Sequence, residues 1–146
     1  MVIIEMEMNE DANTQLLKTA YEKYAAGDFS GLIEHLSDDI EMILPEVENS
    51  PLGGIWHGRA DAIKYFELRC STEDQTDYEV REIIADGDRV AVHGRLTATV
   101  RSTGRHYSTE WVHLLTLQNK LIKSFCSFYD TAAALRAYQM VTTALK

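Results

Sequence analysis

The segment that decides the fold is RVAVHGRLTATVR, residues 89–101. Its apolar and polar side chains alternate along the whole segment, which is the pattern of a β-strand with one covered face. The more apolar face carries Val90, Val92, Gly94, Leu96, Ala98 and Val100. We expect this face to contact helices. The opposite face, which includes His93 and Arg95, is expected to face water or a partner subunit.

Further strands are predicted on both sides of this segment. Alternating or continuous apolar residues predict strands over 78–85, 107–117 and 121–129, joined by short turns at 86–88, 102–105 and 118–120. A short strand is also expected over 40–44, where Pro45 ends it.

Helices are predicted mainly in the first half of the chain. Apolar residues at helical spacing predict one helix over 13–26, ended by Gly27, and another from Arg59 to about Cys70. Ser30 is expected to cap a shorter helix that includes Leu36, residues 46–58 are expected to form a loop, and a last helix follows Asp130. Helices followed by consecutive strands predict an α+β protein with helices on one face of a curved antiparallel sheet.

Composition narrows the class of protein further. The 146 residues are 45% hydrophobic and carry a formal net charge of −9, with no basic run of the kind that grips nucleic acid. No apolar run approaches the length of a membrane span, and no signal peptide is recognised, so a soluble cytoplasmic protein of one domain is expected. The two cysteines are far apart and the five histidines lack metal-binding spacing, so we expect neither a disulfide nor a metal site.

The candidate catalytic residues are His113 and Asp130. A histidine can transfer a proton near neutral pH, and a carboxylate on its other nitrogen would fix the tautomer. Strand parity places Asp130 with Phe128 and Cys126 if the last strand extends that far. Two alternatives stay open: His113 is a packed core residue, and Asp130 is the N-cap of the final helix.

The candidate binding residues form an apolar wall beside His113. This wall is expected to consist of Trp111, Leu96, Cys126 and Phe128. Tyr24 lies on the apolar stripe of the first helix, where its hydroxyl either reaches a ligand or belongs to the core. Trp56 either covers a cavity or fixes its loop to the core.

Four short motifs resemble the nuclear-transport-factor-two-like (NTF2-like) superfamily, and specifically its SnoaL-like and ketosteroid-isomerase-like members. These are Ala25-Ala26-Gly27-Asp28, Gly53-Gly54-Ile55-Trp56-His57-Gly58-Arg59, Ala85-Asp86-Gly87-Asp88 and Phe128-Tyr129-Asp130-Thr131. The resemblance covers roughly residues 14–138, which we take as the core of a single domain over 1–146. It implies a conical α+β barrel with one apolar pocket, and dimers packed through the sheet.

The resemblance also argues against two enzymatic activities that occur in this superfamily. Ketosteroid isomerases place an aspartate before the proline of the first strand, where this chain has Leu44, and a second acid where it has His113. Epoxide hydrolases place Arg-x-Asp where this chain has Trp111-Val112-His113. Both activities are therefore disfavoured.

The sequence therefore predicts a small-molecule-binding protein, with a homodimer formed through the sheet. If it is an enzyme, we expect a cofactor-independent isomerase, lyase or cyclase that moves a proton on a hydrophobic substrate. The dimer is expected because strand 107–117 is apolar on both faces. The alternatives are a non-catalytic ligand-binding or dimerisation module, and a domain whose outer sheet face binds another protein.

Overall fold

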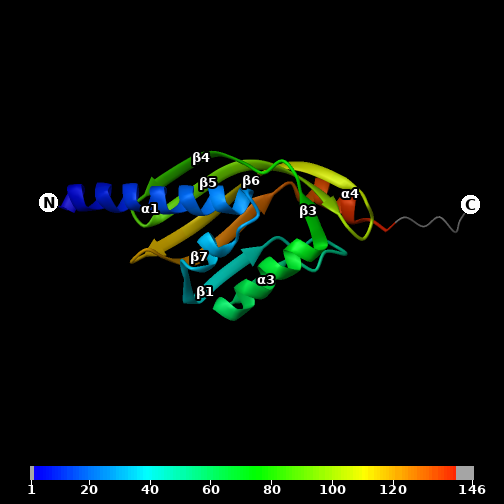
Figure 1. Ribbon diagram of the computed structural model, residues 1–146, viewed down its shortest axis with the longest axis horizontal. Coiled ribbons are helices and arrows are strands. Elements are labelled where there is room, and N and C mark those ends of the chain that lie inside the picture. The colour runs from blue at the N-terminus through cyan, green and yellow to red at the C-terminus, as the bar shows by residue number, and fades with distance from the viewer. Residues whose placement is uncertain (1, 141–146) are drawn as a thin grey trace, which may run out of the picture.

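The computed structural model describes residues 2–140 of the chain and is shown in Figure 1. Four helices accompany a seven-stranded sheet within this part of the chain. The helices are α1 (Val2–Ala25), α2 (Ser30–Ile33), α3 (Arg59–Thr72) and α4 (Thr131–Tyr138). The strands are β1 (Leu36–Leu44), β2 (Gly54–His57), β3 (Glu73–Gln75), β4 (Glu79–Asp86), β5 (Arg89–Val100), β6 (His106–Gln118) and β7 (Leu121–Tyr129).

The sheet has the order β2-β1-β7-β6-β5-β3, with β4 also paired to β5. Every pair is antiparallel except β1 with β7, which run parallel. The predicted α+β class and curved sheet are confirmed, but the sheet is mixed rather than wholly antiparallel. The parallel pair arises because β7, the last strand, returns to lie beside β1, the first.

The inner, concave face of the sheet forms the core. In β5 every second residue from Val90 to Val100 is buried, as the alternation of segment 89–101 predicts. In β6 the buried set includes Trp111, Leu115 and Leu117. The cover for this face comes from α1 and α2 on one side and α3 on the other, while α4 packs on β5 and β6 at the far end (Figure 1).

Four details of the predicted elements are wrong. Helix α1 begins at Val2 rather than near residue 13, and α2 is a single short turn, so Leu36 starts β1 instead of belonging to a helix. Residues 54–57 form strand β2 inside the predicted loop, and 73–75 form β3. Both strands are short and pair at sheet edges, with β1 and β5 respectively, so neither shows an alternation that the sequence could reveal.

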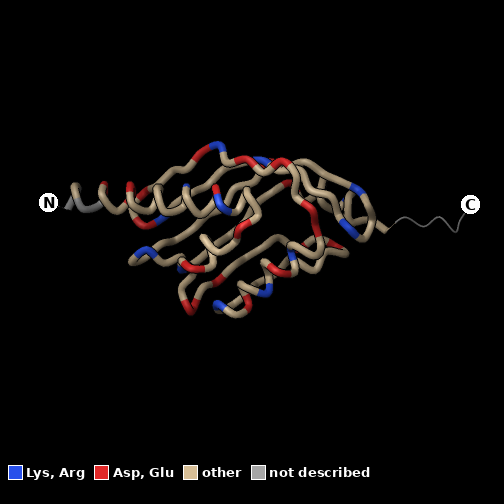
Figure 2. Tube along the Cα trace, in the orientation of Figure 1, with Lys and Arg blue, Asp and Glu red and all other residues tan. Residues whose placement is uncertain are grey.

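Charged residues are distributed along many elements. Figure 2 shows Lys and Arg scattered among the more numerous Asp and Glu, without a basic patch on any one element. Among residues 2–140, no helix is both long enough and apolar enough to cross a membrane.

Candidate functional site

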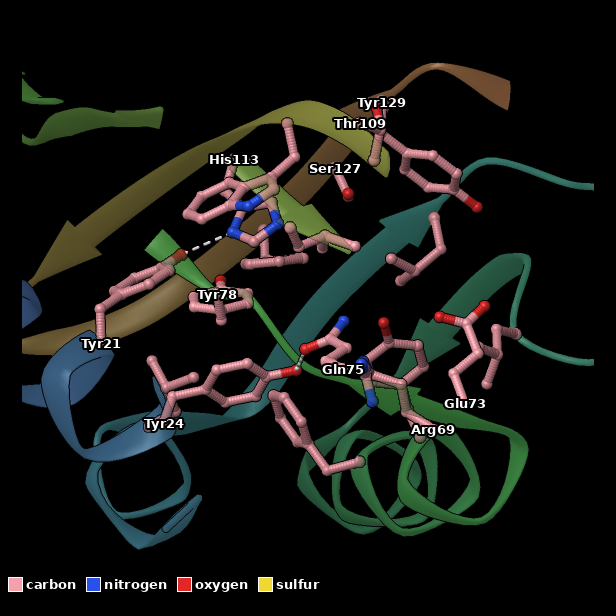
Figure 3. A pocket seen from close by; sticks show the side chains of 18 of the residues that line it. Tyr21, Tyr24, Arg69, Glu73, Gln75, Tyr78, Thr109, His113, Ser127 and Tyr129 are labelled. Atoms are coloured by element: carbon pink, nitrogen blue, oxygen red, sulfur yellow. Dashed lines mark hydrogen bonds between the residues drawn. The ribbon is translucent and has the colours of Figure 1, made fainter. Parts of the chain in front are cut away.

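A cavity lies between the inner face of the sheet and the helices. Its volume is about 70 Å³, and its lining comes mainly from α1, α3, β3 with the segment after it, and strands β5 to β7, with single residues from α2, β1 and the loop before β2 (Figure 3). Aromatic rings make up most of the wall, and two groups of polar side chains interrupt it. One group contains His113 and Tyr21, and the other contains Arg69, Glu73 and Gln75 (Figure 3).

Three aromatic side chains contact the ring of His113. Its Nδ1 lies 2.7 Å from the hydroxyl oxygen of Tyr21. Its ring stacks on Trp111, with centroids 4.3 Å apart, and meets Phe125 on the other side at 4.5 Å. His113 is partly buried and lines the cavity, and burial of its ring lowers the pKa of the imidazole to about 3. The imidazole is therefore neutral at physiological pH.

Tyr21 determines which nitrogen of His113 carries the proton. Burial raises the pKa of the Tyr21 hydroxyl well above its usual value, so this hydroxyl stays protonated. Its one hydrogen-bond partner within residues 2–140 is Nδ1 of His113. When the hydroxyl donates to Nδ1, the single proton of the neutral imidazole lies on Nε2. This leaves an N–H donor on the cavity side with no partner in the described chain.

The second polar group contains a buried carboxylate and a buried guanidinium. Both Glu73 and Arg69 are 6% exposed. The carboxylate of Glu73 accepts hydrogen bonds from the hydroxyls of Tyr107, at 2.9 and 3.0 Å, and of Tyr138. Burial, together with the charge of Glu73, raises the pKa of both tyrosines, so they remain donors. Nearby, the Tyr24 hydroxyl donates to Gln75 Oε1 at 3.3 Å.

Within the described residues, no hydrogen bond joins Asp130 to His113. Its carboxylate accepts the backbone N–H of Ala133 at 3.1 Å and caps α4, which is the alternative considered from the sequence. Register explains the separation, because His113 pairs with Ser127 while β7 ends at Tyr129, opposite Trp111. Tyr21, on a different element, takes the place that the sequence assigned to Asp130.

The predicted apolar wall is divided between the two faces of the sheet. Trp111, Leu96 and Tyr24 line the cavity. Cys126 and Phe128 do not, because the residues of β7 that point inward are Phe125, Ser127 and Tyr129. The pleat therefore turns Cys126 and Phe128 to the outer face, where Phe128 is 52% exposed.

Trp56 fixes a loop and lies outside the cavity lining. Its Nε1 donates to the carbonyl of Leu52 at 3.1 Å, and its ring packs edge-on against Tyr65. This matches the second of the two roles considered from the sequence. Within the described chain, no group of three or more His, Cys, Asp or Glu side chains is placed to hold a metal ion.

Arg69 and Glu73 are the site residues that sequence reasoning missed. A signal for Arg69 does exist, since it lies seven residues after Ala62 and three after Phe66, on the buried stripe of α3. A charged residue on an apolar helix stripe indicates a buried polar role. Glu73 offers no such signal, because it begins a short edge strand.

A curled mixed sheet closed by helices over one cavity defines a protein of the NTF2-like class. The sequence model of the SnoaL-like domain matches residues 17–125, and the chain belongs to this family. An NTF2-like protein from Burkholderia xenovorans LB400 is 30% identical, with a TM-score of 0.78 over 89% of this chain and 98% of that one. A second, from Burkholderia pseudomallei K96243 and of unknown function, is 25% identical, with a TM-score of 0.79 over 88% and 98%.

A more distant structure carries a functional name. This protein from Mesorhizobium loti is named provisionally as a SnoaL-like polyketide cyclase. It is 22% identical, with a TM-score of 0.68 over 79% of this chain and 97% of that one, so it supports the fold alone. No match was found among the curated proteins.

Proposed function

We propose that the protein binds a hydrophobic small molecule in the cavity and acts on it as a cofactor-independent isomerase, lyase or cyclase. The observation that carries this proposal is the neutral imidazole of His113, which is held by Tyr21 and lies among aromatic rings at the cavity wall. Residues in such positions are typical of proton-transfer sites.

The chemistry follows from the tautomer. The Nε2–H of His113 donates a hydrogen bond to a carbonyl oxygen of the substrate. As negative charge develops on that oxygen in an enolate-like transition state, the hydrogen bond strengthens and stabilises this charge, while the proton stays on Nε2. A neutral imidazole suits this role, because it polarises the carbonyl without placing a cation in an apolar cavity.

The size of the cavity adds a requirement. At about 70 Å³ it is smaller than the roughly 150 Å³ of an engineered cavity that holds benzene. A ring-sized substrate therefore needs some of the aromatic lining to turn aside. We expect ligand binding to be accompanied by movement of these rings, with a slow association rate as its signature.

The test of this role is His113→Asn assayed against a panel of cyclic ketones. The amide oxygen can still accept from Tyr21, but the imidazole donor at Nε2 is lost. We expect kcat/KM to fall by about 10²- to 10⁴-fold. The matched control is Asp130→Asn, which keeps a capping side chain on α4 and should retain full activity.

The alternative function is a non-catalytic binding module. In that case wild type and His113→Asn bind the same ketones with similar affinity, and neither turns any of them over. Unchanged turnover in His113→Asn would overturn the catalytic proposal.

We also propose that the protein forms a homodimer through the outer face of the sheet. Six apolar residues, one from each of six strands, stand next to one another across this face in the pairing register. This outer apolar stripe consists of Ile55, Ile43, Cys126, Leu114, Ala91 and Ile84. Its end residues Ile55 and Ile84 are 67% and 59% exposed, and continuous exposed apolar rows of this kind mark interfaces.

Light scattering coupled to size-exclusion chromatography tests the dimer. Wild type should elute with twice the chain mass, and Leu114→Glu, at the middle of the outer apolar stripe, should elute with the mass of one chain. The control is Lys64→Glu, at an exposed position of α3, which also makes the chain more negative and should stay dimeric. A wild type of single-chain mass at micromolar concentration would contradict the proposal.

A further inference from the structure

Some polar side chains that line the cavity have hydrogen-bond partners and others have none. Two buried side-chain donors that line it have no hydrogen-bond partner within the described chain: Nη2 of Arg69 and Nε1 of Trp111. Arg69 is 6% exposed and Trp111 is 2% exposed, so bulk water does not supply the missing acceptors. By contrast, the acceptors at the same cavity, the carboxylate of Glu73 and Oε1 of Gln75, already accept from tyrosine hydroxyls.

The donors of Arg69 and Trp111 therefore lack hydrogen-bond partners, whereas the acceptor oxygens of Glu73 and Gln75 have them. An unpaired buried donor costs free energy in the empty protein. A ligand that brings acceptor oxygens to Arg69 and Trp111 recovers this free energy, while a ligand's N–H or O–H groups cannot pair with these two donors. His113 adds to the same imbalance, because its Nε2–H also faces the cavity without a partner in the described chain.

The charge of the second polar group limits which acceptor fits. Within the described chain, no carboxylate lies within ion-pair distance of the Arg69 guanidinium. Glu73, four residues further along the chain, lines the same cavity. The positive charge of Arg69 and the negative charge of Glu73 therefore balance there. A carboxylate ligand would place a second negative charge beside Glu73, whereas an uncharged carbonyl keeps the balance.

We propose that the ligand of this cavity is an uncharged molecule with two carbonyl oxygens, one of which accepts a hydrogen bond from Nη2 of Arg69. The other carbonyl is assigned to the donors of Trp111 and His113, whose rings are stacked with centroids 4.3 Å apart. The apolar part of the ligand spans the aromatic wall between them. This inference rests on the proposed function, since it assigns the substrate chemistry of the same cavity.

The experiment compares probes with one ring size and different polar groups. Cyclohexane-1,4-dione, cyclohexanone and cyclohexanecarboxylate are titrated into wild type by isothermal calorimetry. We expect the dione to bind most tightly. Cyclohexanone should bind about tenfold more weakly because it lacks one of the two carbonyl acceptors, and the carboxylate about tenfold more weakly because it places a second negative charge beside Glu73. A carboxylate that binds as tightly as the dione would overturn the inference.

Two substitutions separate the hydrogen bond from the charge. Arg69→Met keeps the apolar stem and should weaken the dione by about tenfold, while it leaves carboxylate binding no stronger than in wild type. Glu73→Gln leaves the guanidinium uncompensated and should strengthen the carboxylate by about tenfold, which reverses the preference. Should Arg69→Met not fold, as judged by circular dichroism, Arg69→Lys retains the charge without the planar donors and should weaken the dione.

The possible results distinguish the two proposals. If the probes bind and Arg69 variants bind the dione as wild type does, the Arg69 assignment is wrong and the cavity proposal stands. If none of the probes binds wild type, the cavity is not the ligand site, and both proposals fail.

Discussion

His93 and His113 lie on neighbouring strands, but their surroundings are opposite. His93 on β5 pairs with Val112, the residue immediately before His113 on β6. His113 faces inward, where burial lowers its pKa to about 3. His93 faces outward between two carboxylates, each 2.9 Å from a ring nitrogen, and its hydrogen bonds to Glu110 and then Glu82 raise its pKa.

The comparison shows that the pleat of the sheet decides the chemistry of a histidine. Both residues are histidines, and they lie one position apart in the pairing of β5 with β6. Even so, the inward-facing His113 is a neutral hydrogen-bonding group, whereas the outward-facing His93 is stabilised as a cation. Only the inner one suits a site that polarises a carbonyl. The outer one, next to the outer apolar stripe, belongs to the surface that we propose as the dimer interface.

The largest effect that follows from this comparison is a dependence of stability on pH through His113. Its pKa is about 3 in the folded protein and near 6.5 in the unfolded chain. Below pH 6.5 the unfolded chain therefore binds a proton that the folded protein does not, so the free energy of unfolding falls as the pH falls towards 3. The slope from this group is about 1.4 kcal/mol per pH unit.

Urea denaturation between pH 4.5 and 7.5 measures this effect. His113→Asn lacks the titrating group, so its free energy of unfolding should fall less steeply below pH 6.5 than that of wild type. Parallel curves for the two proteins would mean that His113 is not buried as a neutral ring.

An intermediate effect concerns the space available on the two faces of β5. A Cβ at Gly94 would lie 2.1 Å from the carbonyl oxygen of Glu79 and 2.4 Å from Cζ2 of Trp111. Gly94→Ala should therefore lower the free energy of unfolding by about 1–3 kcal/mol and displace the indole that stacks on His113.

The matched change on the outer face is Ala91→Val. Ala91 lies between Ile84 and Leu114 on the outer apolar stripe, where it is only partly buried. Its effect should stay within about 0.5 kcal/mol in urea denaturation. Equal losses for both substitutions would contradict the assignment of the tightly packed side to the inner face.

The smallest effect belongs to His93. A raised folded pKa stabilises the protein below the unfolded pKa of about 6.5, and this contribution disappears as the pH rises through the folded pKa. His93→Asn should therefore be slightly less stable than wild type at pH 5.5 and equally stable at pH 8.5. Because His93 is partly exposed and its two carboxylate partners are exposed, added salt should shrink the difference in stability. A difference that grows with pH would contradict the sign that we derive.

The inner face of strand β5 was predictable because its pattern is asymmetric: Val90, Val92 and Val100 leave one face plainly apolar. In β6 the period of two places Trp111 and His113 on one face, but both faces are apolar, so the pattern alone does not tell which face is inner. Strand β7 was not predictable in the same way, because aromatic residues occur on both of its faces: Phe125 and Tyr129 on one, Phe128 on the other. A register shift after Thr116 also moves the pairing, and no residue pattern announces it.

The sequence by itself determined the α+β class, the inner face of β5, the shared face of Trp111 and His113 in β6 and the capping ability of Asp130. These depend on local periodicity and on residues within a few positions of one another, which a linear pattern records. Only the tertiary structure decided that Tyr21 is the partner of His113, that Cys126 and Phe128 face outward, and that Arg69 and Glu73 share the cavity. Those relations join residues from different elements, and they depend on register and curvature, which arise only when the sheet closes over the helices.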